Sequence, residues 1–274
     1  MSDEVARVSK HWLALREPAD AAARSRELVE QLAGRPRAGG RWLIHDLGGG
    51  AGAMGRWLAP LLPGSQHWIV HDRDAALLAL AAADGPGPAA DGAAVTVETK
   101  QSDITRLQPR ELADATLITA SALLDMLTED ELGRIVGACA AAGCPILLAM
   151  SVVGRVGLNP SDPLDDRVAA EFNAHQRRLT GRGRLLGPDA VAAAVERFRQ
   201  LGTEVLVRSS PWRLGATQAD LAEVWLTGWI GAACEQQPEL TAAAEAYVRR
   251  RMEQATAGQL EVTVDHADLL ALPG

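Results

Sequence analysis

A glycine-rich segment with one acidic residue is the part of the sequence best suited to hold a ligand. Residues 46–52 read DLGGGAG and follow an apolar run. Glycines let the backbone turn sharply and approach a ligand, and a helix that follows presents free N–H groups. A turn without a ligand is the alternative, but the position between an expected strand and an expected helix favours a binding loop. The segment therefore predicts a cofactor site at the end of a strand.

Two classes of cofactor compete for this loop. Gly50-x-Gly52-x-x-Gly55 matches the pattern of dinucleotide sites, although that pattern normally begins where the strand ends. Asp46-x-Gly48-x-Gly50-x-Gly52 fits better, and it resembles the signature of class I S-adenosylmethionine-dependent methyltransferases. A carboxylate at the strand tip would repel a pyrophosphate but would favour an ammonium and a sulfonium. The charge favours S-adenosylmethionine, and an NAD-dependent oxidoreductase is the alternative.

The resemblance covers about residues 41–153. It includes the residues at the end of the second expected strand. Asp72 lies where this family places an acid that accepts both ribose hydroxyls, and Arg73 follows it. The resemblance therefore implies that both residues belong to the cofactor site. An acid at this position does not separate the two cofactor classes, because NAD sites carry one as well.

Residues after the third and fourth expected strands complete the implied cofactor site. Asp103 would accept from the adenine amine while Ile104 packs on the ring, and Ser121 lies in the segment that flanks the methionine arm. Asp103 could instead be an N-cap of the next turn.

The N-terminal segment offers arginines for the carboxylate of the cofactor. Arg16, Asp20 and Arg24 fall on one helix face if the helix passes through Pro18. In the methyltransferases that this chain resembles, such a helix closes over the cofactor. The resemblance therefore implies a contact of Arg24 or Arg16 with the methionine carboxylate, and a surface ladder of ion pairs is the alternative.

Two residues are candidates for a general base, Asp125 and His175. Methyl transfer needs a base only when the acceptor is an alcohol or a protonated amine. Asp125 could instead cap the helix that we expect to begin near Thr128.

The substrate side is predicted from position and charge. Residues 173–184 follow the fifth expected strand and gather a histidine and four arginines in an acidic protein. Ligands of open α/β sheets bind beyond the carboxyl ends of the strands. We therefore expect Asn173 and Arg178 to contact a polar or anionic substrate, with Trp212 and Arg213 as a further wall. A solvated helix end and simple packing are the alternatives.

Alternating strands and helices must position these residues. The expected fold is α/β: a doubly wound, mainly parallel, seven-stranded Rossmann-like methyltransferase sheet with an N-terminal helical cap and helical insertions in the C-terminal half. One helical segment is expected within 10–33, and Pro18 suits the first turn of a helix. The expected strands are 42–47, 67–72, 94–100, 115–121, 145–153, 203–210 and 260–270. The expected later helices are 53–62, 74–83, 129–142, 165–179, 188–201, 218–234 and 240–255.

The pattern also predicts how the chain is divided. Residues 1–38 are expected to form the cap and 39–274 the methyltransferase domain. Within that domain we expect the cofactor half at 39–155 and substrate-side helical insertions at about 158–200 and 216–258.

Composition excludes several classes of partner. The 274 residues carry 27 Lys+Arg against 35 Asp+Glu, a net charge of −8, which argues against nucleic acid and anionic membranes as partners. The three cysteines have no zinc or disulfide spacing, and no other metal motif is present, so no metal site is expected. The polar N-terminus predicts a cytoplasmic protein. The sequence leaves the oligomeric state open.

These observations predict methyl transfer from S-adenosylmethionine to a small polar, possibly anionic, metabolite by in-line displacement. Besides the NAD-dependent oxidoreductase, a non-catalytic protein that binds S-adenosylmethionine stays an alternative, because no unmistakable catalytic motif is present.

Overall fold

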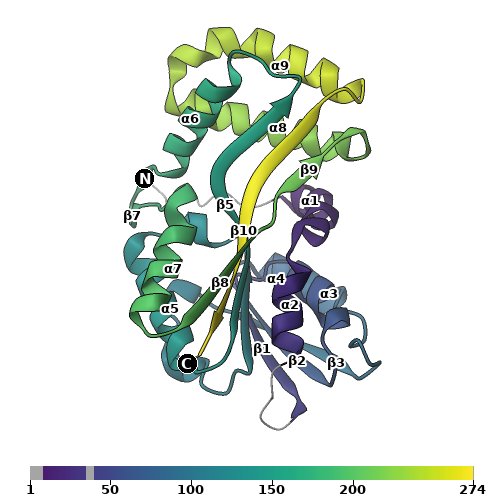
Figure 1. Cartoon of the computed structure of the whole chain (residues 1–274), viewed down its shortest axis with the longest axis vertical. Coiled ribbons are helices and arrows are strands. Elements are labelled where there is room, and N and C mark those ends of the chain that lie inside the picture. Colours follow the sequence, from purple (N-terminus) through teal and green to yellow (C-terminus); the bar gives the residue numbers. More distant parts are fainter. Residues whose placement is uncertain (1–8, 35–39, 274) are drawn as a thin grey trace.

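The computed structural model describes residues 9–34 and 40–273 and has one large mixed sheet (Figure 1). The strand order is β3-β2-β1-β4-β5-β10-β8, and β10 runs antiparallel to both of its neighbours while the other pairs are parallel. The predicted doubly wound, mainly parallel sheet is thus confirmed. The strands are β1 (Trp42–Leu47), β2 (Gln66–Asp72), β3 (Val95–Gln101), β4 (Leu117–Ser121), β5 (Ile146–Asn159), β8 (Glu204–Ser209) and β10 (Glu261–Leu272).

Helices cover both faces of the sheet, because successive strand residues point to opposite sides. In β5, Leu147 and Ala149 join one core, and Ile146 and Leu148 join the other. The first core is completed by α2 (Arg26–Ala33) and α3 (Ala53–Leu58), and the second by α5 (Glu129–Ala141) and α7 (Ala190–Gln200). The short helix α4 (Ala75–Ala83) packs on β2 and β3. The order of strands reverses between β1 and β4, where ligands of such sheets bind.

The N-terminal region differs from the prediction of a single helix. It forms α1 (Lys10–Ala23) and then α2, because Arg24 is extended at ψ 138° and the side chain of Ser25 caps α2. Ser9 caps α1, so the helix begins well before Pro18, and the prediction that Pro18 lies in the first turn is wrong. The predicted boundary between residues 38 and 39 lies outside the described residues.

Strand β5 is longer than expected at its C-terminal end. β5 continues to Asn159 and pairs with β10 along its length, and the paired ends carry α6 (Asp165–Gln176), α8 (Ala219–Gln236) and α9 (Thr241–Thr256), which lie at the top of Figure 1. A short strand, β9 (Trp212–Leu214), also pairs with β10 and was not predicted. The last six residues of β5 alternate between half-buried and exposed, and they include two glycines, which weakened the strand signal.

The predicted helix 165–179 ends early, because the chain turns into a small hairpin. This hairpin is made of β6 (Leu179–Thr180) and β7 (Gly183–Arg184), and just after it the Leu186 N–H donates to the Leu127 carbonyl at 2.8 Å. The next helix, α7, packs beside α5 and covers the sheet. Within the described residues, no helix is both long and apolar enough to cross a membrane.

Candidate functional site

The glycine loop follows β1 directly and passes very close to Asp46. Gly48, Gly50 and Gly52 all have positive φ, at 64°, 55° and 83°. A Cβ on Gly49 would lie 2.4 Å from Asp46 Oδ2, which is far inside contact distance. Only glycines therefore allow the backbone to pass over this carboxylate.

Asp46 is fully buried, and only one of its two carboxylate oxygens has a hydrogen-bond partner among the described residues. Its Oδ1 accepts a hydrogen bond from Thr119 Oγ1 on β4 at 2.7 Å, and its Oδ2 has no partner among the described residues. Burial raises the pKa of Asp46 to about 7, because the charged form loses hydration. An unpaired buried carboxylate oxygen is costly, and it is satisfied when a ligand cation reaches it.

Arg24 is the positive counterpart on the opposite side of the same cavity. It donates from Nη2 to Ser121 Oγ at 2.9 Å and from Nη1 to the Ala53 carbonyl at 3.4 Å. Its guanidinium lies over the Trp57 ring, 5.3 Å from the centroid. Its Nε is buried and has no described partner, and burial lowers the pKa of Arg24 from its ordinary value.

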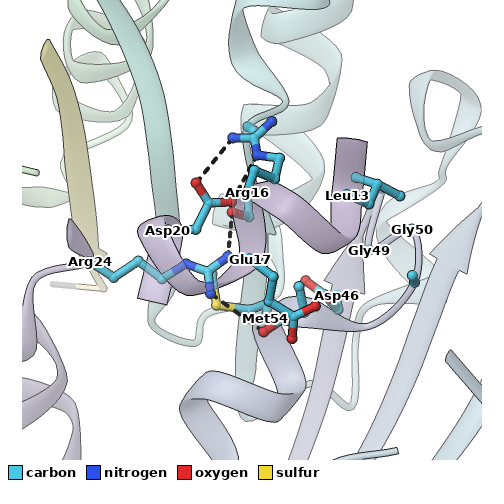
Figure 2. A pocket seen from close by; sticks show the side chains of 14 residues that line it. Leu13, Arg16, Glu17, Asp20, Arg24, Asp46, Gly49, Gly50 and Met54 are labelled. Carbon is cyan, nitrogen blue, oxygen red and sulfur yellow. Dashed lines mark hydrogen bonds and ion pairs between the residues drawn. The ribbon is translucent and has the colours of Figure 1, made fainter. Parts of the chain in front are cut away.

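The cavity between α1 and the glycine loop has a volume of about 80 Å³ (Figure 2). Ligand pockets usually enclose about 300–1,000 Å³. Side chains of α1 narrow it from above: Leu13, Arg16, Glu17 and Asp20. The polar atoms that line the site suit a charged ligand, and α1 must move outward to let a ligand of nucleoside size enter.

Asp72 ends β2 and holds the glycine loop by the backbone. Its Oδ2 accepts from the Gly50 N–H at 3.0 Å, and its Oδ1 accepts from the Asp74 N–H at 2.8 Å. Each carboxylate oxygen has a second lone pair that can accept from a ligand. Arg73 is exposed, and its carbonyl accepts from Gln101 Nε2.

The segment after β3 places an apolar side chain beside the glycine loop. A Cβ on Gly48 would lie 3.7 Å from Ile104 Cδ1 and 3.2 Å from Leu123 Cδ1, so these two side chains form an apolar wall over the loop. Asp103 caps the following turn by accepting from the Thr105 N–H at 3.0 Å. This is the capping role that the sequence left open, and the exposed carboxylate keeps free acceptor positions.

Asp125 lies in the short turn Leu124–Met126 that follows β4. Thr128 caps α5 together with Glu131, so Asp125 is not the cap of this helix. Burial raises the pKa of Asp125 to about 6, and the charges of Arg16 and Arg178 oppose the rise.

The other predicted acceptor-side residues hold the protein together in this structure. His175 Nε2 lies 3.1 Å from Glu235 Oε2 on α8, and the two side chains form a pair. Asn173 donates to the Gly154 carbonyl at 2.7 Å, and Arg178 Nη1 donates to the His175 carbonyl at 3.3 Å.

Trp212 and Arg213 point to opposite sides of β9. Trp212 is buried, donates from Nε1 to Asp20 Oδ1 at 2.9 Å, and has the Arg16 guanidinium over its ring at 5.2 Å. Arg213 is exposed and lines an outer groove between α1 and the start of α8.

Two residues of this region carried no signal in the sequence. Asp268 on β10 accepts from the N–H groups of Met150 and Ser25 and from Ser210 Oγ, at 2.7–2.8 Å, and so ties the junction of α1 and α2 to the sheet. Arg56 on α3 bonds to the glycine loop and to α1. Neither lies in a motif, because their partners come from other elements.

Comparisons with known proteins support the fold. No family model matches the sequence, and no curated protein matches it. Among solved structures, the cyclopropane synthase MmaA2 from Mycobacterium tuberculosis has a TM-score of 0.51 at 14% identity, over 96% of this chain and 94% of that chain. Geranyl diphosphate C-methyltransferase from Streptomyces coelicolor A3(2) has a TM-score of 0.48 at 11% identity, over 100% of this chain and 88% of that chain. The strand order and the first match together define the class I S-adenosylmethionine-dependent methyltransferase fold.

Proposed function

We propose that this chain is a cytoplasmic enzyme that transfers a methyl group from S-adenosylmethionine to a small polar, possibly anionic, metabolite. One observation carries the proposal. Asp46 Oδ2 and Arg24 Nε are buried, lack partners among the described residues, and belong to residues that line the same cavity. A free carboxylate oxygen and a free guanidinium N–H complement the ammonium and carboxylate of an amino acid.

The remaining cofactor residues suit a nucleoside. Asp72 keeps lone pairs for two ribose hydroxyls, and Ile104 with Leu123 offers an apolar wall for adenine. Asp103 would accept from the adenine amine, and Arg73 would lie at the solvent edge of the ribose. Together these contacts would fix the cofactor along the carboxyl ends of β1, β2 and β3.

The bound cofactor would supply a methyl group already activated by the sulfonium, so the chain contributes mainly proximity and orientation. Asp125 is the base that we favour, because burial raises its pKa to about 6, and such a carboxylate can take a proton near neutral pH. His175 is less suited, since its Nε2 is paired with Glu235. Arg178 would bind the polar or anionic part of the acceptor and hold the reacting atom in line with the methyl group.

The buried carboxylate also weighs against the dinucleotide alternative. A pyrophosphate over the glycine loop would meet the unpaired oxygen of Asp46, and two negative groups at low dielectric repel each other strongly. A non-catalytic S-adenosylmethionine-binding protein would use the same cofactor contacts. Only turnover separates that role from an enzyme.

Calorimetry with four ligands tests the cofactor. S-adenosylmethionine and S-adenosylhomocysteine should bind, and NAD and NADP should not. Binding of NAD at comparable affinity would overturn the proposal. Incubation with labelled S-adenosylmethionine and fractionated metabolite pools then tests catalysis, and binding without any methyl incorporation would favour the non-catalytic role.

A further inference from the structure

Helix α1 closes the cofactor cavity and is attached to the domain by several polar contacts. Asp20 binds Trp212 on β9, and Arg24, just after the helix, binds Ser121 on β4. Glu17 binds Arg56 on α3. Because the closed cavity is only about 80 Å³, at least one of these contacts must break when a nucleoside-sized ligand enters.

Arg56 joins three elements, of which α1 and the glycine loop line this cavity. Its Nε and Nη2 form a two-pronged pair with the carboxylate of Glu17, with both distances at 2.7 Å. Its Nη1 donates to the Ala51 carbonyl of the glycine loop at 2.6 Å and to the Asp84 carbonyl at the end of α4 at 2.8 Å. One rigid guanidinium therefore fixes the loop, the end of α4 and the cap helix relative to one another.

The Glu17–Arg56 contact is the one best placed to open. The side chain of Arg56 is 20% exposed and that of Glu17 is 29% exposed, so water can replace the lost bonds. Asp20, Trp212 and Arg24 are buried, and breaking their bonds would leave buried polar groups unpaired, which costs more. A hinge is also present, since Arg24 is extended and the Ser25 N–H is fixed by buried Asp268.

We propose that Arg56 is a positioning residue that docks α1 on the glycine loop through Glu17, and that opening of this ion pair sets the rate of cofactor exchange. The inference rests on the proposed binding of S-adenosylmethionine in this cavity.

Stopped-flow fluorescence with S-adenosylhomocysteine tests whether opening of the Glu17–Arg56 pair sets the rate of exchange. The tryptophans Trp12 and Trp57 serve as reporters. Glu17→Gln should raise both the association and the dissociation rate by about 5- to 20-fold, because it frees α1 in the bound and the free protein alike. The equilibrium affinity should change by less than about 3-fold, since the glycine loop keeps its bond to Arg56.

Two further variants separate the parts of this proposal. Arg56→Gln removes the loop anchor as well, so it should weaken S-adenosylhomocysteine binding by about 10-fold or more in addition to speeding exchange. Glu27→Gln is the matched control, because Glu27 forms a similar two-pronged pair with Arg208 between α2 and β8, away from the cavity. It should leave both rates unchanged.

Hydrogen exchange of the ligand-free protein gives an independent readout. Glu17→Gln should raise exchange of the amides in 10–24 relative to wild type and to Glu27→Gln. If the variant binds S-adenosylhomocysteine with unchanged rates, or if α1 keeps its full protection, the pair is an ordinary ion pair and the inference is wrong. If wild type does not bind S-adenosylhomocysteine at all, the proposed function fails instead.

Discussion

The two sides of the site are built in different ways. On the cofactor side, several polar contacts join neighbouring strands or the loops that follow them, such as Asp46 with Thr119 or Asp72 with Gly50. On the acceptor side, the contacts join segments far apart in the chain, and Asp20 and Trp212 are 192 residues apart. A short motif can therefore define the first side, whereas only the folded chain defines the second.

The two sides also differ in what they leave unpaired. The cofactor side buries a free carboxylate oxygen on Asp46 and a free N–H on Arg24. The acceptor side pairs most of its charges internally, as in His175 with Glu235 or Arg177 with Asp189. Unpaired buried charges reduce stability and indicate a place kept ready for a ligand. Paired charges mainly fix the shape of the acceptor side.

The largest effect is expected from filling the space over Asp46. Gly49→Ala places a methyl group 2.4 Å from Asp46 Oδ2 and 2.7 Å from Val70 Cγ1, so the loop or the carboxylate must shift. Affinity for S-adenosylhomocysteine should fall by more than about 100-fold by calorimetry, a loss of roughly 3 kcal/mol.

A glycine on α5 provides the control for this change. Gly137→Ala meets no atom within 4 Å and should stabilise the helix by about 0.5–1 kcal/mol without affecting binding. Normal binding by Gly49→Ala would mean that the loop does not pass closely over the carboxylate when the ligand is bound.

The end of β2 gives the next largest effect. Asp72→Ala removes two hydroxyl acceptors and the bonds to Gly50 and Asp74, so cofactor affinity should fall by roughly 2–4 kcal/mol. Asp74→Ala is the control: it removes the cap of α4, costs about 1 kcal/mol of folding stability, and should leave calorimetric affinity nearly unchanged. Equal affinities in both variants would place the ribose elsewhere.

The sequence predicted most of the sheet, because buried parallel strands alternate with helices in a pattern that burial itself imposes. It missed β9 and the far end of β5, where strands lie over the helical region and carry glycines or arginines. It also predicted one N-terminal helix where two form, since the cap at Ser25 depends on an anchor at Asp268, 243 residues away.

The cofactor residues can be predicted from the order of motifs along the chain. The contacts of the acceptor-side residues cannot. His175, Arg178 and Trp212 were proposed from charge and position alone, and their actual partners lie on α8, α6 and α1. The partners of His175 and Trp212 lie 60 and 192 residues away, so the local sequence does not indicate them. For the same reason Arg56 stands out only once α1 is seen packed on the glycine loop.

A variant of Arg178 tests whether the acceptor side reads a charge. Arg178→Ala should lower turnover by roughly 10- to 150-fold, because a charge-assisted contact contributes about 1.5–3 kcal/mol, and cofactor affinity should barely change. Arg177→Ala is the control, since its guanidinium is paired with Asp189 away from Asp125. Both are assayed with the acceptor found by methyl incorporation. Full activity of Arg178→Ala would mean that residues 173–184 form a solvated helix end that does not contact the substrate.

The smallest effect should appear in how the free energy of unfolding changes with pH. Asp46 contributes to it on the cofactor side and Asp125 on the acceptor side. Asp46 has its pKa raised to about 7 in the fold, whereas it loses its proton near pH 4 when unfolded. Between these values the folded state holds the extra proton, so the contribution of Asp46 to stability falls as pH rises from about 4 to 7. Asp125, raised to about 6, adds a change of the same sign over a narrower range.

Asp46→Asn should therefore be more stable than wild type at pH 8 in the ligand-free state, by about 1–2 kcal/mol, because a buried charge is removed. The advantage should shrink towards pH 4, where wild type is protonated in both states. Urea unfolding at several pH values measures this, and Asp220→Asn, on the exposed start of α8, controls for the change in net charge. The same variant should bind S-adenosylhomocysteine more weakly, since the ammonium loses its counter-charge. A variant that is less stable at pH 8, or that binds equally well, would show that the free oxygen of Asp46 is not a place kept for a cation.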